Sequence, residues 1–193
     1  MLNIIINADD CGKNKSINNC IQKFIEAGKL TSTTIMANMN DLEGAIALYR
    51  CYQDKISFGV HLNLTEGSPI LDSDILLQKG LYIESSEGLK FNISPFRNRM
   101  LSSAELNAIE KELDAQIAIL EDSGIHISHI DSHHHIHTGF AFLSLLPRLA
   151  RRHNIYKIRR MRNYIPQTSE IYMVVDYKGA VPSNKNNKLF WDL

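Results

Sequence analysis

The chain has no excess charge of either sign, because its 21 lysines and arginines balance its 21 aspartates and glutamates when histidine is neutral. This balance provides no overall attraction to nucleic acid or to an anionic membrane. No apolar run approaches the length of a membrane-spanning helix, and the first residues lack a secretory signal pattern. We therefore expect neither a membrane protein nor a general nucleic-acid binder.

Cysteine is also scarce. Cys11, Cys20 and Cys51 are odd in number and are not spaced as a zinc-binding pair, so a reducing, cytoplasmic setting fits best. Hydrophobic residues nevertheless make up 44% of the sequence, which is enough for a core and argues against disorder. The length of 193 residues predicts a single domain over residues 1–193.

Histidine is concentrated in one place, since five of the eight histidines lie within residues 129–137 together with an aspartate. A purification tag would sit at a terminus, and an exposed metal-scavenging tract would have low-complexity flanks, so a functional metal site is favoured. If the run is a strand, alternate side chains share a face, namely His129, Asp131, His133, His135 and His137. Only one or two of them can reach the same ion, so further ligands must come from elsewhere.

Strand-like and helix-like patterns alternate about five times, which predicts an α/β architecture with a parallel sheet. The expected strands are residues 2–8, 30–37, 56–64, the start of 129–137, 156–159 and 171–175. The expected helices are residues 15–27, 41–52, 102–123 and 140–152. Residues 66–101 are mixed in character and are predicted to form an irregular insertion, such as a lid or substrate loop.

Ligand-type side chains fall at or just past the ends of three predicted strands, at Asp9 and Asp10, at His61, and at 131–133. The carboxyl ends of parallel strands share one edge, so these residues are expected to meet. Adjacent carboxylates in extended chain point apart, so one can bind metal while the other faces the reacting water. The alternatives are that an aspartate merely caps the next helix and that His61 is a satisfied core residue.

Four segments together resemble the YdjC-like carbohydrate deacetylases. They are residues 7–12 (Asn-Ala-Asp-Asp-Cys-Gly), 31–34, 59–65 and 129–137, in order within a match from about 3 to 162. The resemblance implies a TIM-barrel-like (β/α) fold with parallel strands and a divalent metal, usually magnesium, with zinc possible. It implies hydrolysis of the N-acetyl group of an N-acetylated sugar such as a chitooligosaccharide.

Carried over by position, the resemblance implies that Asp10, His61 and His133 bind the metal. Asp9 matches the aspartate expected to act as general base. The amine leaving group needs a proton, and we assign this role to His135, with the neighbouring His137 as the alternative. Asp131 is expected to orient a ligand histidine instead of binding the metal itself.

The sequence departs from the family pattern in two places. Cys11 stands where phenylalanine is more usual, either as a thiol near the metal or as a small buried filler. Family members also continue further and carry a Cys-His-Pro segment, whereas no histidine follows His153. We expect a C-terminally truncated member, a missing part supplied by another chain, or an open barrel, with dimerisation or poor stability as the consequence.

Three other functions remain open at this point. The chain could be another metal-dependent sugar hydrolase or isomerase, or an inactive family member that binds metal and sugar. Residues 148–162 include seven lysines or arginines and no acid, so a basic nucleic-acid module is the third. We favour a solvated helix followed by a strand whose arginines partner the carboxylates of the site.

Overall fold

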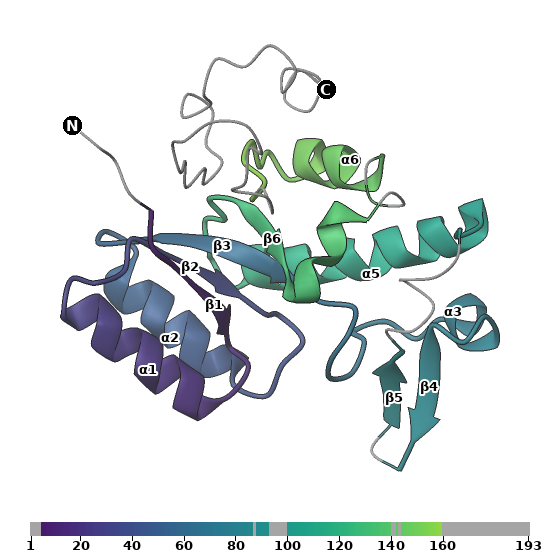
Figure 1. Cartoon of the computed structure of the whole chain (residues 1–193), viewed down its shortest axis with the longest axis horizontal. Helices are drawn as coiled ribbons and strands as arrows, with labels where there is room; N and C mark the ends of the chain where they lie inside the picture. The colour runs from purple at the N-terminus through teal and green to yellow at the C-terminus, as the bar shows by residue number, and fades with distance from the viewer. Residues whose placement is uncertain (1–4, 87, 93–99, 140–141, 143, 160–193) are drawn as a thin grey trace, which may run out of the picture.

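A parallel sheet of four strands carries the fold. The computed structural model describes residues 5–86, 88–92, 100–139, 142 and 144–159 (Figure 1). In sheet order, the strands are β1 (Asn7–Cys11), β2 (Ser32–Ile35), β3 (Ser57–Leu62) and β6 (Ile130–Ser132). All three pairings are parallel, which confirms the predicted α/β class. Within the described ranges the sheet stays open and does not close into a barrel.

Helices cover the sheet in the order that the sequence predicts. They are α1 (Lys15–Glu26), α2 (Leu42–Tyr52), α5 (Ser103–Asp122) and α6 (Leu145–Arg152). Figure 1 shows α1 and α2 side by side next to β1 and β2, while α5 runs behind β3 with α6 beside it. Their apolar stripes pack on the strands to form one core. No helix in the described part of the chain is long and apolar enough to cross a bilayer.

Local capping explains where two of the helices begin. The Asn14 side chain accepts a hydrogen bond from the Ile17 amide, 3.0 Å away, and so caps α1. Ser102 and Glu105 form the reciprocal capping box predicted for α5. These signals lie within a few residues of each other, so the sequence alone reveals them.

Two strands end differently from the prediction. β1 continues through both aspartates to Cys11, with a register irregularity after Ala8 and a left-handed φ of 67° at Asp10. β6 stops at Ser132, and the short 3₁₀ segment η1 (His133–Thr138) follows. The predicted alternation over 129–137 is therefore wrong beyond Ser132, because the chain turns there.

The insertion is more regular than the sequence suggests. It contains α3 (Asp74–Gln78) and an antiparallel hairpin of β4 (Tyr82–Ser85) and β5 (Gly88–Phe91), which projects from beside α3 in Figure 1. The buried Glu112 carboxylate of α5 accepts hydrogen bonds from the backbone amides of residues 70 and 71 and anchors its start. The role as a lid or substrate loop stays a prediction.

Of the two remaining predicted strands, one lies at the end of the described region and the other lies beyond it. Residues 156–159 form only a parallel bridge, in which Ile158 pairs with Ile130 of β6. The strand predicted at 171–175 lies outside the described residues.

Gly59 is required where β3 passes the buried His129 ring. A Cβ atom at this position would lie 2.5 Å from Cε1 of His129. We expect Gly59→Ala to lower the free energy of unfolding by about 1–3 kcal/mol, because the added methyl group would overlap a buried ring. Urea unfolding measures this change. In a His129→Ala background the same substitution should cost much less, and an equal cost in both backgrounds would refute the explanation.

Candidate metal centre

Three side chains from three strand ends meet at one point. Oδ1 of Asp10, in β1, lies 3.2 Å from Nε2 of His61 in β3. The same oxygen lies 2.9 Å from Nδ1 of His133, the residue that follows β6. Both histidines are buried, whereas Asp10 is partly exposed. The structure thus brings together the three side chains that the sequence proposes as metal ligands.

The chemistry of this cluster fits a divalent cation. The three ligand atoms lie within 4.8 Å of one another. Although Asp10 Oδ1 is close to both imidazoles, it is buried and makes no hydrogen bond of proper geometry. Ligand atoms that converge without hydrogen-bonding one another are suited to share an ion. One carboxylate and two imidazoles also leave coordination positions for water and substrate.

The backbone after β1 is shaped to present Asp10. Gly12 has a φ of +91°, and a Cβ there would come within 2.9 Å of the Met36 carbonyl oxygen. Asn18 of α1 fixes this turn, since its side chain accepts from the Gly12 amide (2.7 Å) and donates to Asp41. The alternative that an aspartate of the pair caps α1 is wrong, because Asn14 does so.

His61 is held from its other side by a carboxylate and a hydroxyl. Its Nδ1 lies 3.0 Å from Thr34 Oγ1 and 3.4 Å from Asp131 Oδ2. Burial alone would lower the pKa of His61, but Asp10 and Asp131 outweigh it and raise that pKa to about 9. Asp131 therefore occupies the position expected of a carboxylate that orients a ligand histidine.

Arg159 bridges the carboxylates of Asp9 and Asp131. One of its terminal nitrogens lies 2.6 Å from Asp9 Oδ1 and 2.6 Å from Asp131 Oδ2. Burial raises the pKa of Asp131, but His61 and Arg159 hold it well below its usual range. This geometry confirms that an arginine of the basic segment partners the carboxylates of the site. It also gives the adjacent Asp9 and Asp10 different surroundings.

Neither of the two histidines considered as proton donors belongs to the group of three converging ligand atoms. His137 is buried, with Nδ1 2.5 Å from Ser132 Oγ and Nε2 2.8 Å from the Arg159 carbonyl oxygen. Burial lowers the pKa of His137, and its Nε2 contact ties it to the backbone of Arg159. No contact among the described residues joins His135 to the three candidate ligands. The left-handed φ of 57° at His135 explains this, because it breaks the alternation of a strand.

Cys11 is a buried filler. Its side chain is fully buried, and the thiol lies 3.5 Å from Asn18 Oδ1. Burial raises the pKa of this thiol to about 12, so it stays protonated near neutral pH.

Sequence reasoning missed the rim of the site just after β3. Glu66 Oε1 lies 3.4 Å from His133 Nε2, and Glu66 Oε2 lies 2.6 Å from Lys13 Nζ. Thr65 Oγ1 lies 2.8 Å from Nδ1 of His134. Burial raises the pKa of Glu66, but Lys13 and His133 outweigh it and lower it. Their position in the sequence could have indicated these residues, because they follow the same strand end that carries His61.

A parallel α/β sheet with an Asp-His-His cluster at its carboxyl edge defines the class of this protein. The family model described as YdjC-like protein matches residues 3–188, and the chain therefore belongs to the YdjC-like family. It is 35% identical to a protein named carbohydrate deacetylase from Brevibacillus brevis, covering 80% of this chain and 58% of that protein. A protein of the same name from Halalkalibacterium halodurans is also 35% identical, with 80% and 62% covered.

A solved structure supports the same fold. A proposed cellobiose-phosphate cleavage protein from Enterococcus faecalis superposes with a TM-score of 0.61 at 30% identity. The match covers 79% of this chain and 57% of that one. The chain thus spans about three-fifths of the length of the relatives described here.

Proposed function

We propose that the protein is a metal-dependent carbohydrate deacetylase that removes the N-acetyl group from an N-acetylated sugar such as a chitooligosaccharide. One observation carries this proposal: Asp10 Oδ1 lies between His61 and His133, while the adjacent Asp9 contacts Arg159 instead. Membership of a family whose curated relatives are named carbohydrate deacetylases supports it.

Each residue of the site then has a distinct task. Asp10, His61 and His133 would hold a divalent metal, which when bound polarises the acetamide carbonyl and lowers the pKa of water. Asp9 accepts the proton of the attacking water. Arg159 holds the Asp9 carboxylate in place through a charge-assisted hydrogen bond.

Protonation of the departing amine is the least constrained step. His135 is our candidate for it, since His137 is already engaged through both ring nitrogens. Nδ1 of His135 is buried and has no hydrogen-bond partner.

The basic segment favours this proposal over nucleic-acid binding. Arg148 pairs with Glu110 of α5, and Arg152 pairs with both Glu110 and Asp114. These ion pairs neutralise the positive charges that would be needed to bind the phosphate backbone of a nucleic acid. Magnesium as the metal, a homodimer and a cytoplasmic location remain predictions. Two imidazole ligands suit zinc better than magnesium, so activity should be measured with both metals.

Acetate release from N,N′-diacetylchitobiose, with and without added Mg²⁺ or Zn²⁺, tests the proposal. The bound metal in the same preparation is measured by mass spectrometry. We expect release that stops with a chelator and returns with metal. Bound metal without release from several N-acetyl sugars would contradict the proposal and favour an inactive, metal-binding member of the family.

A further inference from the structure

His133 lies between two carboxylates, one on each ring nitrogen. Nδ1 is 2.9 Å from Oδ1 of Asp10, and Nε2 is 3.4 Å from Oε1 of Glu66. The residue is only 6% exposed, and its Nε2 atom is buried without a hydrogen-bond partner. A buried ring nitrogen in this state needs an acceptor or a donor close by.

The other candidate ligand histidine has the same layout. His61 turns Nε2 toward Asp10 and Nδ1 toward Asp131, at 3.2 and 3.4 Å. A neutral imidazole has one lone pair and one N–H group, so an ion at one nitrogen places the proton on the other. Carboxylates commonly accept that proton and thereby fix the tautomer and the ring orientation.

We propose that Glu66 is a positioning residue for the metal centre. Its carboxylate accepts the Nε2–H group of His133 and so presents the Nδ1 lone pair to a cation held by Asp10 and His61. The inference rests on the proposed metal centre and does not depend on the deacetylase activity. Oε1 of Glu66 and Nε2 of His133, now 3.4 Å apart, are the two atoms that this hydrogen bond would join.

Contacts with Lys13 and Asn63 hold Glu66 in position to orient His133. Lys13 Nζ, 2.6 Å from Oε2, engages one carboxylate oxygen and leaves Oε1 directed at His133. The backbone of Glu66 is fixed as well, because Asn63 accepts from its amide (3.1 Å) and donates to its carbonyl oxygen (2.7 Å). A side chain anchored at both ends can hold an imidazole in a single orientation.

A second cation site is the competing explanation, since Glu66, His133 and His134 also place three ligand atoms close together. Two contacts oppose it. The Lys13 ammonium lies 2.6 Å from Glu66 Oε2 but 3.9 Å from Asp10 Oδ2, so it opposes a cation at Glu66 more strongly than one at Asp10. Nδ1 of His134 is engaged by Thr65 Oγ1. His133 would also have to bridge two ions through both nitrogens.

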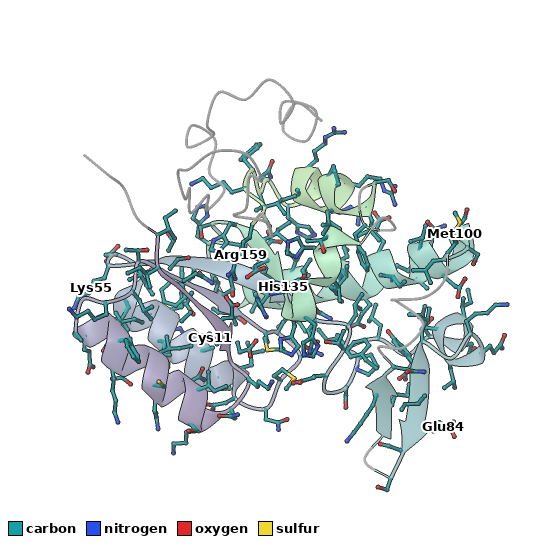
Figure 2. All side chains as sticks on the ribbon, viewed as in Figure 1. Cys11, Lys55, Glu84, Met100, His135 and Arg159 are labelled. Atoms are coloured by element: carbon teal, nitrogen blue, oxygen red, sulfur yellow. The ribbon has the colours of Figure 1, made fainter. Side chains whose placement is uncertain are left out.

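Titration of the metal-free 193-residue chain with Co²⁺, followed by visible absorption, tests the proposal. We expect Glu66→Ala to weaken Co²⁺ binding about 10- to 100-fold while the spectrum at saturation matches the wild type. Glu66→Gln should recover part of this loss, because its amide oxygen can still accept the Nε2–H group. Glu84→Gln is the matched control, because Glu84 lies on the β4–β5 hairpin, well away from His135 in Figure 2.

Three results would overturn the inference. The first is that Glu66→Ala binds Co²⁺ with the affinity of the wild type. The second is that the absorption spectrum of this variant at Co²⁺ saturation differs from that of the wild type. The third is that the wild-type chain binds two Co²⁺ ions and the variant binds one. The second and third results would make Glu66 a direct ligand. Failure of the wild-type chain to bind Co²⁺ would instead remove the metal centre itself, which separates the two proposals. Circular dichroism of each metal-free variant checks that it is folded.

Discussion

Replacing Asp9 by asparagine is expected to reduce acetate release by about 10²- to 10⁴-fold while the metal stays bound. The amide has the same shape as the carboxylate but cannot accept a proton at neutral pH. Asp10, His61 and His133 are unaltered in this variant, so the affinity for metal should change little. Turnover at saturating metal and sugar gives kcat, and mass spectrometry gives the metal content.

The surroundings of Asp9 make this substitution informative. Arg159 contacts both Asp9 and Asp131, so it keeps one anionic partner when Asp9 is neutralised. The arginine is therefore not left buried without a counter-charge, and a large loss of stability is not expected. Asp54→Asn, at an exposed position after α2, is the matched control. Full activity in the Asp9 variant would show that the base is another residue.

Replacing His133 by alanine is expected to abolish metal binding. The substitution removes one of the three converging ligand atoms and leaves only Asp10 and His61. The loss of affinity should exceed the roughly 10- to 100-fold that removal of an outer partner costs. The Co²⁺ titration measures it, and His126→Ala, at an exposed histidine before β6, serves as the control.

Thermal unfolding provides an independent check of the same substitution. A ligand that binds only the folded state stabilises it, so added metal should raise the Tm of the wild-type chain. The same addition should leave the Tm of the His133 variant unchanged. An equal rise in both proteins would place the metal elsewhere. A loss restricted to His134→Ala would identify the neighbouring histidine as the ligand.

The sequence by itself determined the order of the four sheet strands and of the helices that cover them, and the main cluster of the site. Helix signals such as Asn14 and the Ser102–Glu105 box act over three or four residues, so they are visible without a structure. The alternation of strands and helices implied a parallel sheet, whose strand ends share one edge. That rule alone predicted that residues 9–10, 61 and 131–133 would converge, although they are far apart in the chain.

Only the tertiary structure decided the partners of these residues. The histidine run leaves its strand at Ser132, and the left-handed backbone at His134 and His135 breaks the alternation of side chains that a strand would give. Such conformations are costly for residues other than glycine and persist where surrounding contacts impose them, here including the bond from Thr65 to His134.

The same limit applies to the residues around the ligands. Arg159 reaches Asp9 across 150 positions of sequence, and Glu66 reaches His133 from the loop after a different strand. No local pattern encodes such pairs, because they depend on how strand ends and loops are placed in space. The sequence therefore predicted the candidate ligands, whereas the packing of the sheet decided which side chains orient them.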